Sequence, residues 1–391
     1  MANRWLYARI EFVGAFVTLS AGVFLLININ RIDAGVAGIS LFYARSFLEY
    51  VYWFIRQYTQ VEMNLNSVER VQEYLEIDQE APAVIEGHRP PAAWPTTGAI
   101  EVKNLVVRYA PELDPVLHGI SFSTKAHEKI GIVGRTGSGK STMGLSFFRF
   151  LEASEGSISI DGIDIAKIGL EDLRSKITII PQDAVLFNGT IRSNLDPFDE
   201  HTDEAVWEAL ERAHLANPAD RAKHLAGPGS SSSSVDTEEN RAPSSIVSLS
   251  QKVSEGGSNF SQGQRQLLCL SRALLRNSKV IIMDEATASV DFETDTKIQA
   301  TIREEFTNST LLCIAHRLRT IIDYDRVLVL DQGNIIEYDT PYNLLCGNSG
   351  TGVFKSMCEQ SGEYDILLTM SKESQAHQLE EQRSDDHSKI Y

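Results

Sequence analysis

The sequence is poor in cysteine and in positive charge, and each shortage narrows what the protein can be. Its four cysteines, Cys269, Cys313, Cys346 and Cys358, lack the spacing of a metal knuckle or a redox pair. Cys269 and Cys313 lie in apolar runs, so we expect them to be core residues in a reducing, cytosolic setting. The formal net charge is −17. Because a nucleic-acid binder needs a basic face for the phosphates, we expect no nucleic-acid partner.

Charge is also nearly absent from the first part of the chain. Residues 12–29 are a run of 18 positions without a charged side chain. As a helix this run would be roughly 27 Å long, close to the hydrocarbon thickness of a bilayer. A second apolar run, residues 34–55, is interrupted by Arg45 and Glu49. These charges are four positions apart and can pair, and their cost in lipid predicts that they face protein or water.

The two runs predict two membrane spans, at about 12–29 and 34–55, with a short loop between them. A signal peptide has a shorter apolar region and a cleavage site of small residues, and these runs do not fit that pattern. A buried hairpin of a soluble protein stays an alternative for the second run alone. With the rest of the chain in the cytosol, Arg4, Arg9 and Arg56 lie on the cytosolic side, as the positive-inside rule prefers, and Arg31 in the outer loop is an exception.

A glycine-rich loop carries the first sign of chemistry. Residues 129–133 (KIGIV) predict a short apolar strand, and residues 134–141 (GRTGSGKS) follow it in the pattern G-x-x-x-x-G-K-[ST]. Glycines let backbone N–H groups turn towards phosphates, and the helix that follows adds its positive N-terminus. In this pattern Lys140 reaches the β- and γ-phosphates and Ser141 binds Mg²⁺. The sequence therefore predicts a site for ATP and Mg²⁺.

A second element supplies the acids that such a site needs. Residues 280–283 (VIIM) predict an apolar strand that ends at Asp284, where a carboxylate can bind Mg²⁺. Glu285 follows at once, and it is our candidate for the base that orients or deprotonates the attacking water. A hydrophobic run before Asp-Glu is common by itself, so this prediction depends on the phosphate loop.

Further motifs resemble those of one family. Residues 259–266 (NFSQGQRQ) resemble the signature loop of ATP-binding cassette proteins, and residues 288–291 (ASVD) resemble the loop that joins two cassettes. Gln182 stands where the family has its glutamine loop, His316 where it has its switch histidine, and Tyr109 where an aromatic ring stacks on adenine. The resemblance covers nearly the whole chain. It is closest to the second cassette of the multidrug-resistance-associated (C) subfamily, in a fungal-like form.

The resemblance implies an ATP held between the phosphate loop of one cassette and the signature loop of another. The residues that it assigns to catalysis are Lys140, Gln182, Glu285 and His316, and those assigned to Mg²⁺ are Ser141, Gln182 and Asp284. The residues assigned to the nucleotide are Tyr109, Gly134, Arg135, Thr136, Gly137, Ser138, Gly139, Lys140, Ser141, Thr142, Ser261, Gly263 and Gln264.

Two positions depart from the family's signature. Phe260 replaces the usual leucine and Gln262 replaces a glycine. A bulky side chain where backbone approaches phosphate would weaken the site that this loop completes. The subfamily typically has one site that hydrolyses poorly, and we assign Gln262 to that one. The site containing Glu285 is expected to be competent.

The predicted fold is an α/β P-loop nucleotide-binding domain with a mixed sheet core, an antiparallel β subdomain and a helical subdomain, preceded by two transmembrane helices. Strands of the core are expected at 279–284, 310–315 and 326–330. An antiparallel strand is expected at 99–110, a hairpin with an Asp-Gly turn at 156–162, and a helix at 203–216.

The chain divides into four predicted regions. Residues 1–64 are the end of a transmembrane domain, 65–97 a linker that contains a proline-rich stretch, 98–360 the nucleotide-binding domain, and 361–391 a tail. Within the domain, a serine-rich insert at about 225–251 is expected to be disordered, or else a phosphorylated regulatory segment. Two helices are too few for a transport pathway, so we expect the C-terminal end of a longer chain or a truncated gene product.

The leading functional hypothesis is an ATPase that drives a small-molecule substrate across a plasma or vacuolar membrane, with the first half of the transporter and the lipid bilayer as partners. A channel or channel regulator of the same subfamily is the first alternative. A soluble cassette protein is the second, and the two apolar runs argue against it.

Overall fold

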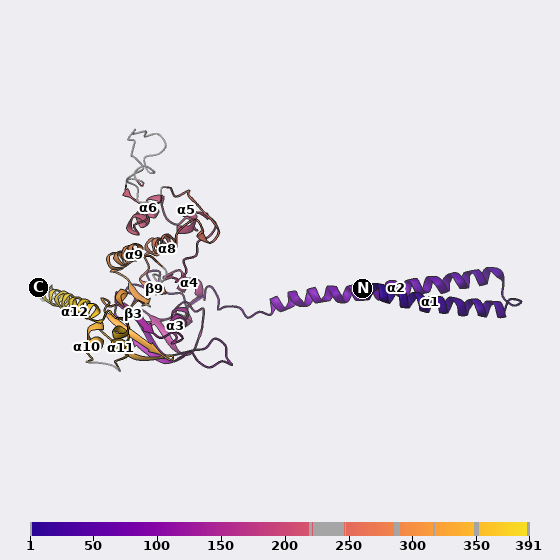
Figure 1. The fold of residues 1–391 in the computed structure, drawn as a ribbon, viewed down its shortest axis with the longest axis horizontal. Helices are drawn as coiled ribbons and strands as arrows, with labels where there is room; N and C mark the ends of the chain where they lie inside the picture. The colour runs from indigo at the N-terminus through magenta and orange to yellow at the C-terminus, as the bar shows by residue number, and fades with distance from the viewer. Residues whose placement is uncertain are drawn as a thin grey trace, which may run out of the picture. The chain divides into compact units, whose positions relative to one another are not determined.

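The computed structural model describes residues 2–218, 221, 246, 248–284, 290–315, 317–347 and 352–388. The chain separates after Glu80 into two compact units, residues 1–80 and 81–391 (Figure 1).

The first unit is a helical hairpin. Helix α1 runs from Ala2 to Ile27 and helix α2 from Ala34 to Leu75. Asp33 caps α2 by accepting a hydrogen bond from the N–H of Gly35. The rings of Tyr7 and Tyr52 meet edge to face, with centroids 5.3 Å apart, so the two helices pack antiparallel (Figure 1).

One segment of this hairpin has the length and composition of a membrane span. It is Tyr7–Ile27 in α1, and no second span is found among the described helices. The two-span prediction is therefore supported for its first half. Arg45 and Glu49 line a cavity of about 670 Å³ between the helices together with Glu11. No ion pair joins Arg45 to Glu49 in the described hairpin, so the pairing that their spacing suggested is not formed.

The second unit contains a six-stranded sheet in the order β12-β11-β3-β10-β9-β6. All neighbouring pairs are parallel except the edge pair β11–β12. The strands are β3 Lys129–Gly134, β6 Ile177–Ile180, β9 Val280–Asp284, β10 Thr310–Ile314, β11 Arg326–Asp331 and β12 Asn334–Asp339. The three core strands predicted from the sequence are confirmed to within a residue at their ends.

A second, antiparallel sheet has the order β2-β1-β4-β5. Its strands are β1 Ile100–Val107, β2 Leu117–Ser123, β4 Ala153–Ile160 and β5 Ile163–Asp164. Asp161 and Gly162 join β4 to β5 with φ of 49° and 76°, the left-handed pair that a type I′ turn requires. The hairpin predicted from the Asp-Gly dipeptide is confirmed.

The six-stranded sheet is buried on both faces, as parallel sheets usually are. Along β9, Ile281 and Met283 belong to one hydrophobic cluster, while Val280 and Ile282 belong to the other. The first cluster lies under most of the helices, and the second lies under α3, α4 and the antiparallel sheet (Figure 1). Cys269 and Cys313 are buried, as predicted.

The helices of this unit cover the sheet and build a helical part. They are α3 Lys140–Phe147, α4 Leu170–Arg174, α5 Ile191–Leu195, α6 Asp203–Arg212, α8 Gln262–Arg276, α9 Phe292–Glu305, α10 Pro341–Cys346, α11 Val353–Gln360 and α12 Tyr364–Ser388. The described residues also form short helical turns (η1 Ile165–Lys167, η3 Glu255–Gly257, η4 Leu318–Thr320) and a two-stranded ribbon (β7 Gly189–Thr190 with β8 Lys252–Val253).

Helix α6 is shorter than the sequence predicted. Its first turn carries Asp203 and Glu204, which suit a helix N-terminus, and it ends at Arg212 rather than at residue 216. Trp207 is fully buried against the rest of the helical part. Most of the serine-rich insert falls in 222–245, which lies outside the described residues.

The proline-rich stretch after Glu80 is attached to the second unit. The carbonyls of Pro82 and Ala83 accept hydrogen bonds from the N–H groups of Leu170 and Glu171, at 3.1 and 2.9 Å. These bonds give partners to two N–H groups in the first turn of α4, a helix that has no side-chain cap. A Cβ on Gly169 would lie 2.2 Å from the Ala83 carbonyl oxygen, so only glycine allows the backbones to approach this closely.

Candidate nucleotide-binding site

The parallel strands bring the predicted site elements to one edge of the sheet. The phosphate loop follows β3, Asp284 ends β9, and Gln182 comes two residues after β6. Ile314, at the end of β10, is paired with Asp284, and Ile180 is paired with Met283. Parallel strands share their carboxyl ends, which is where ligands bind in open α/β sheets.

The loop from Gly134 to Gly139 has the backbone that a phosphate cradle needs. Gly137 and Gly139 have φ of 82° and 99°, which other residues rarely adopt. A Cβ on Gly139 would also lie 2.7 Å from a methyl carbon of Leu117. Helix α3 starts directly after it at Lys140, and no side chain caps the N–H groups of its first turn. An anion at this point would accept from them.

Two side chains of the loop fit a phosphate ligand. Lys140 is 6% exposed, and its ammonium donates to the carbonyls of Gly134 and Arg135 at 2.9 and 3.1 Å. The hydroxyl of Ser138 is buried and has no hydrogen-bond partner among the described residues. Ser141 is exposed at the start of α3. Buried polar groups normally have hydrogen-bond partners. The Ser138 hydroxyl and the Lys140 ammonium can both donate hydrogen bonds to the oxygens of a triphosphate.

Tyr109 lies beside the loop, although 30 residues separate it from α3 in the sequence. Its hydroxyl is 3.2 Å from the Oγ1 of Thr142, in the first turn of α3. The side chain is 54% exposed, which leaves ring surface open to a ligand. This placement suits an aromatic ring that stacks on the base of a nucleotide held by the loop.

Two of the predicted catalytic residues cannot be placed. Glu285 and His316 lie outside the described residues. Their neighbours Asp284, half-buried, and Ala315, buried, are at the ends of adjacent strands of the sheet. Gln182 is exposed after β6, and its backbone carbonyl accepts a 2.6 Å hydrogen bond from the side chain of Gln266.

The signature residues lie at the start of α8 and not on the sheet edge. Ser261 caps the helix, and its hydroxyl accepts from the N–H of Gln264 while the side chain of Gln264 accepts from the N–H of Ser261. This reciprocal capping box fixes the first turn. Gly263 is buried against Thr294 of α9, whose Cγ2 would lie 2.9 Å from an added Cβ.

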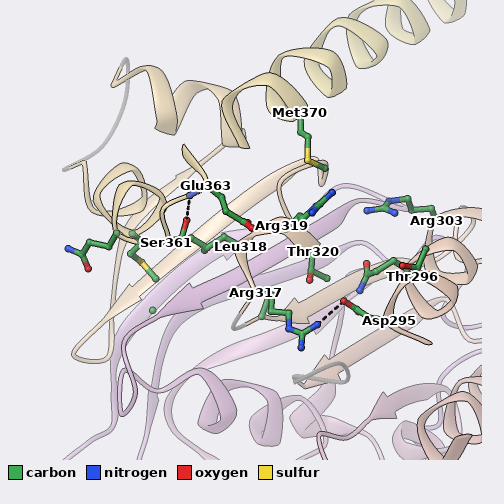
Figure 2. A pocket seen from close by; sticks show the side chains of 15 residues that line it. Asp295, Thr296, Arg303, Arg317, Leu318, Arg319, Thr320, Ser361, Glu363 and Met370 are labelled. Carbon is green, nitrogen blue, oxygen red and sulfur yellow. Dashed lines mark hydrogen bonds and ion pairs between the residues drawn. The ribbon is translucent and has the colours of Figure 1, made fainter. Parts of the chain in front are cut away.

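A cavity of about 820 Å³ lies next to this edge. Its walls come mainly from α9, η4 and the helices α11 and α12, with Gly134 and Ala315 at its border. Figure 2 shows the side chains of Arg317 and Asp295, which both line it, pointing towards one another, and their ion pair is 2.9 Å long. Of residues 134–142, which build the cradle, Gly134 alone lines this cavity, so we do not assign the triphosphate to it.

Sequence reasoning missed the contact of Gln266. The signal was present, because Gln266 lies on the buried face of α8 with Leu270 and Ala273, at spacings of four and three. A polar residue on an apolar helix face needs a partner, but its partner is more than eighty residues away along the chain.

Together the glycine loop after a parallel strand, the buried lysine and the acid at a neighbouring strand end define a P-loop nucleotide-binding domain. Residues 117–288 match the ABC transporter family. The chain belongs to this family, as its motifs suggested.

Relatives resemble the chain over nearly its whole length. It is 52% identical over 377 residues to a pleiotropic ABC efflux transporter of multiple drugs of Candida glabrata, covering 96% of this chain. It is 52% identical over 379 residues to the ATP-dependent bile acid permease of Saccharomyces cerevisiae, covering 97% of this chain. Human ATP-binding cassette sub-family C member 3 is 47% identical over 362 residues and 93% of this chain. The chain spans 22% of the length of each relative.

A solved structure shares the fold. A bacterial Atm1-family ABC exporter with ATP bound matches 85% of this chain and 53% of its own, with a TM-score of 0.61 and 28% sequence identity. The second unit therefore has the fold of an ABC exporter nucleotide-binding domain, a domain that binds ATP in that exporter.

Proposed function

We propose that this chain binds and hydrolyses ATP with Mg²⁺ as part of a membrane exporter. The observation that carries the proposal is the cradle at residues 134–142, where an uncapped helix, the buried Lys140 and the Ser138 hydroxyl converge. Families of this kind couple ATP hydrolysis to transport, and the first relatives include a drug exporter and a bile acid permease.

Each residue at the sheet edge has a proposed task. Lys140 and the N–H groups of the loop would hold the β- and γ-phosphates, and Tyr109 would stack on the adenine. Ser141, Asp284 and Gln182 would hold Mg²⁺, which when bound neutralises phosphate charge and orients the reacting oxygens. Glu285 would act as the base towards the attacking water, and His316 would contact the γ-phosphate. Ser261, Gly263 and Gln264 would complete a second ATP site with the other cassette.

The first unit is proposed to sit in the bilayer. Apolar side chains on α1 and α2 are widely exposed, among them Phe16 and Phe42 at 67% and 68%. Such surface is stable in lipid or against other membrane helices. We propose that residues 34–55 form a second span and that Arg45 and Glu49, in the cavity between the helices, face other helices or water. The membrane would be the plasma or the vacuolar membrane, with the second unit in the cytosol.

The first half of the transporter is the proposed partner of both units. On the second unit, a groove of about 370 Å³ is lined by Ile179, Val185, Phe187 and Phe198. Phe187 and Phe198 are 70% and 76% exposed. An apolar groove beside Gln182 would receive a helix of the membrane domain, which would connect nucleotide chemistry with the transport pathway. The transported substrate is a small molecule, and the relatives at 52% identity are named for different ones.

Replacing Lys140 tests the cradle. Lys140→Ala removes the buried ammonium next to the phosphates, so we expect photolabelling by 8-azido-ATP to be lost or strongly reduced. Lys167→Ala, which changes a lysine whose side chain is 72% exposed and paired with Asp164, should label like the wild type. Equal labelling of Lys140→Ala and wild type would contradict the assignment of the cradle.

A further inference from the structure

The side chain of Gln266 joins two elements that are far apart in the sequence. Its Nε2 donates to the backbone carbonyl oxygens of Pro181 and Gln182, at 3.2 and 2.6 Å. Gln266 is 3% exposed, so water does not compete for these bonds. One buried amide therefore holds the backbone at the glutamine loop to helix α8.

The orientation of this amide is determined by its surroundings. Its Oε1 is buried without a hydrogen-bond partner in the described structure. Turning the amide over would place that oxygen against the two carbonyl oxygens and lose both hydrogen bonds. The position thus requires a donor, and an unpaired buried acceptor is the cost of placing it there.

Neighbouring contacts make the connection rigid. At the start of α8, the capping box of Ser261 and Gln264 lies two to five residues before Gln266. Just past the other end of α8, the hydroxyl of Ser278 is 2.7 Å from the hydroxyl of Thr178 in β6. Both hydroxyls are buried. Helix α8 and the residues that follow it are therefore tied twice to the β6 segment, once within the strand and once after it.

We propose that Gln266 is a positioning residue that makes the glutamine loop and the signature end of α8 move as one body. This inference rests on the proposed function, in which Gln182 serves the ATP site of this cassette and Ser261 and Gly263 serve the opposite one. The amide of Gln266 then links the two ATP sites within a single cassette. A shift of the signature loop when the cassettes associate is passed directly to the backbone of Gln182.

Two substitutions separate this role from a merely structural one. Gln266→Met keeps the length and burial of the side chain and removes the donor. Gln266→Glu supplies a donor only while its carboxyl is protonated, because the carboxylate would repel the carbonyl oxygens of residues 181 and 182. Ser271→Ala is the control, since it removes a buried hydroxyl of α8 that, in the described structure, donates to the carbonyl of Leu267 within the same helix.

The measurement is steady-state ATP hydrolysis by each variant, co-expressed with the first half of the transporter in membranes, over a range of pH. We expect Gln266→Met to lower kcat about 10-fold to 100-fold, the size of a misplacement effect, while KM for ATP changes little. Gln266→Glu should approach wild-type kcat at the acid end and lose it as pH rises. Ser271→Ala should match the wild type.

Wild-type kcat in Gln266→Met would overturn the inference, and so would equal pH profiles of Gln266→Glu and wild type. If the wild type itself hydrolyses no ATP, the proposed function fails instead. Amide hydrogen exchange then still tests the connection, because residues 182–186 should exchange faster in Gln266→Met than in wild type or Ser271→Ala. Unchanged exchange there would overturn it.

Discussion

At the scale of single residues, the carboxylate of Asp161 holds the segment that leads into β1. It accepts hydrogen bonds from the N–H groups of residues 96–99, at 2.7 to 3.1 Å, and from the hydroxyl of Thr97 at 2.6 Å. Partial burial acts to raise the pKa of Asp161, but these bonds outweigh it and lower the pKa to about 2. The ionised carboxylate therefore stabilises the folded state.

Asp161→Asn should lower the melting temperature at neutral pH by about 2–4 °C, because an amide offers one acceptor where the carboxylate offers two. The folded pKa lies below the unfolded value of about 3.9, so the contribution is complete above pH 4 and disappears as pH falls towards 2. Thermal unfolding of the full chain, followed by tryptophan fluorescence at several pH values, measures it. A difference between variant and wild type that persists unchanged at pH 2 would contradict this account.

Tyr109 shows how a single contact supports a sequence-based assignment. Adenine stacking was inferred for it from resemblance alone, and the sequence offers no local reason to place it near Lys140. The hydroxyl contact with Thr142 places it at the start of α3. Its role towards adenine stays a prediction, and so do the roles of Glu285 and His316.

At the scale of elements, the proline-rich stretch after Glu80 is held to α4 within the second unit. Helix α4 leads within two residues into β6, which leads to Gln182. The stretch also carries Arg89, whose guanidinium makes two hydrogen bonds to Asp172 at 2.8 and 3.3 Å, and Trp94, which is 3% exposed. The chain that leaves α2 is thus fastened to the segment that positions the glutamine loop.

Gly169→Ala should detach this stretch. The added Cβ would lie 2.2 Å from the Ala83 carbonyl oxygen and 2.6 Å from the Cα of Val84, so the backbones must separate. We expect limited proteolysis to cut within residues 81–93 faster than in wild type. Arg89→Ala is the comparison: its side chain is 64% exposed, and exposed ion pairs contribute little, about 0–1 kcal/mol.

Equal cleavage of Gly169→Ala and wild type would mean that α4 does not hold the stretch. Faster cleavage in Arg89→Ala than in Gly169→Ala would mean that the ion pair, not the backbone contact, fastens it.

The sequence was most informative about which segments form secondary-structure elements. Short apolar runs such as 280–284, followed by glycine or acidic residues, predicted strands and site loops, because buried parallel strands have a distinctive composition. Helix ends were less certain, and α6 stops at Arg212 because Ala213 leaves helical geometry. Contacts such as Gln266 with Gln182 depend on packing between distant segments, and no local pattern reports them. Arg45 and Glu49 could pair by their spacing but form no ion pair in the described hairpin, because spacing allows a contact without requiring it.

At the scale of the whole molecule, the chain corresponds to 22% of the length of its relatives. The domain supplies one cradle and one signature loop, located on different elements. In the proposed exporter both are used, each with a complement from the other cassette. The two helices of the first unit would likewise contribute only part of a transport pathway, which needs a bundle.

The central claim is that the site containing Asp284 and Glu285 hydrolyses ATP. The most direct test is ATP hydrolysis by this chain co-expressed with the first half of the transporter in membranes, comparing wild type with Glu285→Gln. We predict strong turnover in the wild type and a loss of about 100-fold or more in the variant, with ATP binding retained. Bound ATP without turnover in either protein would contradict the claim.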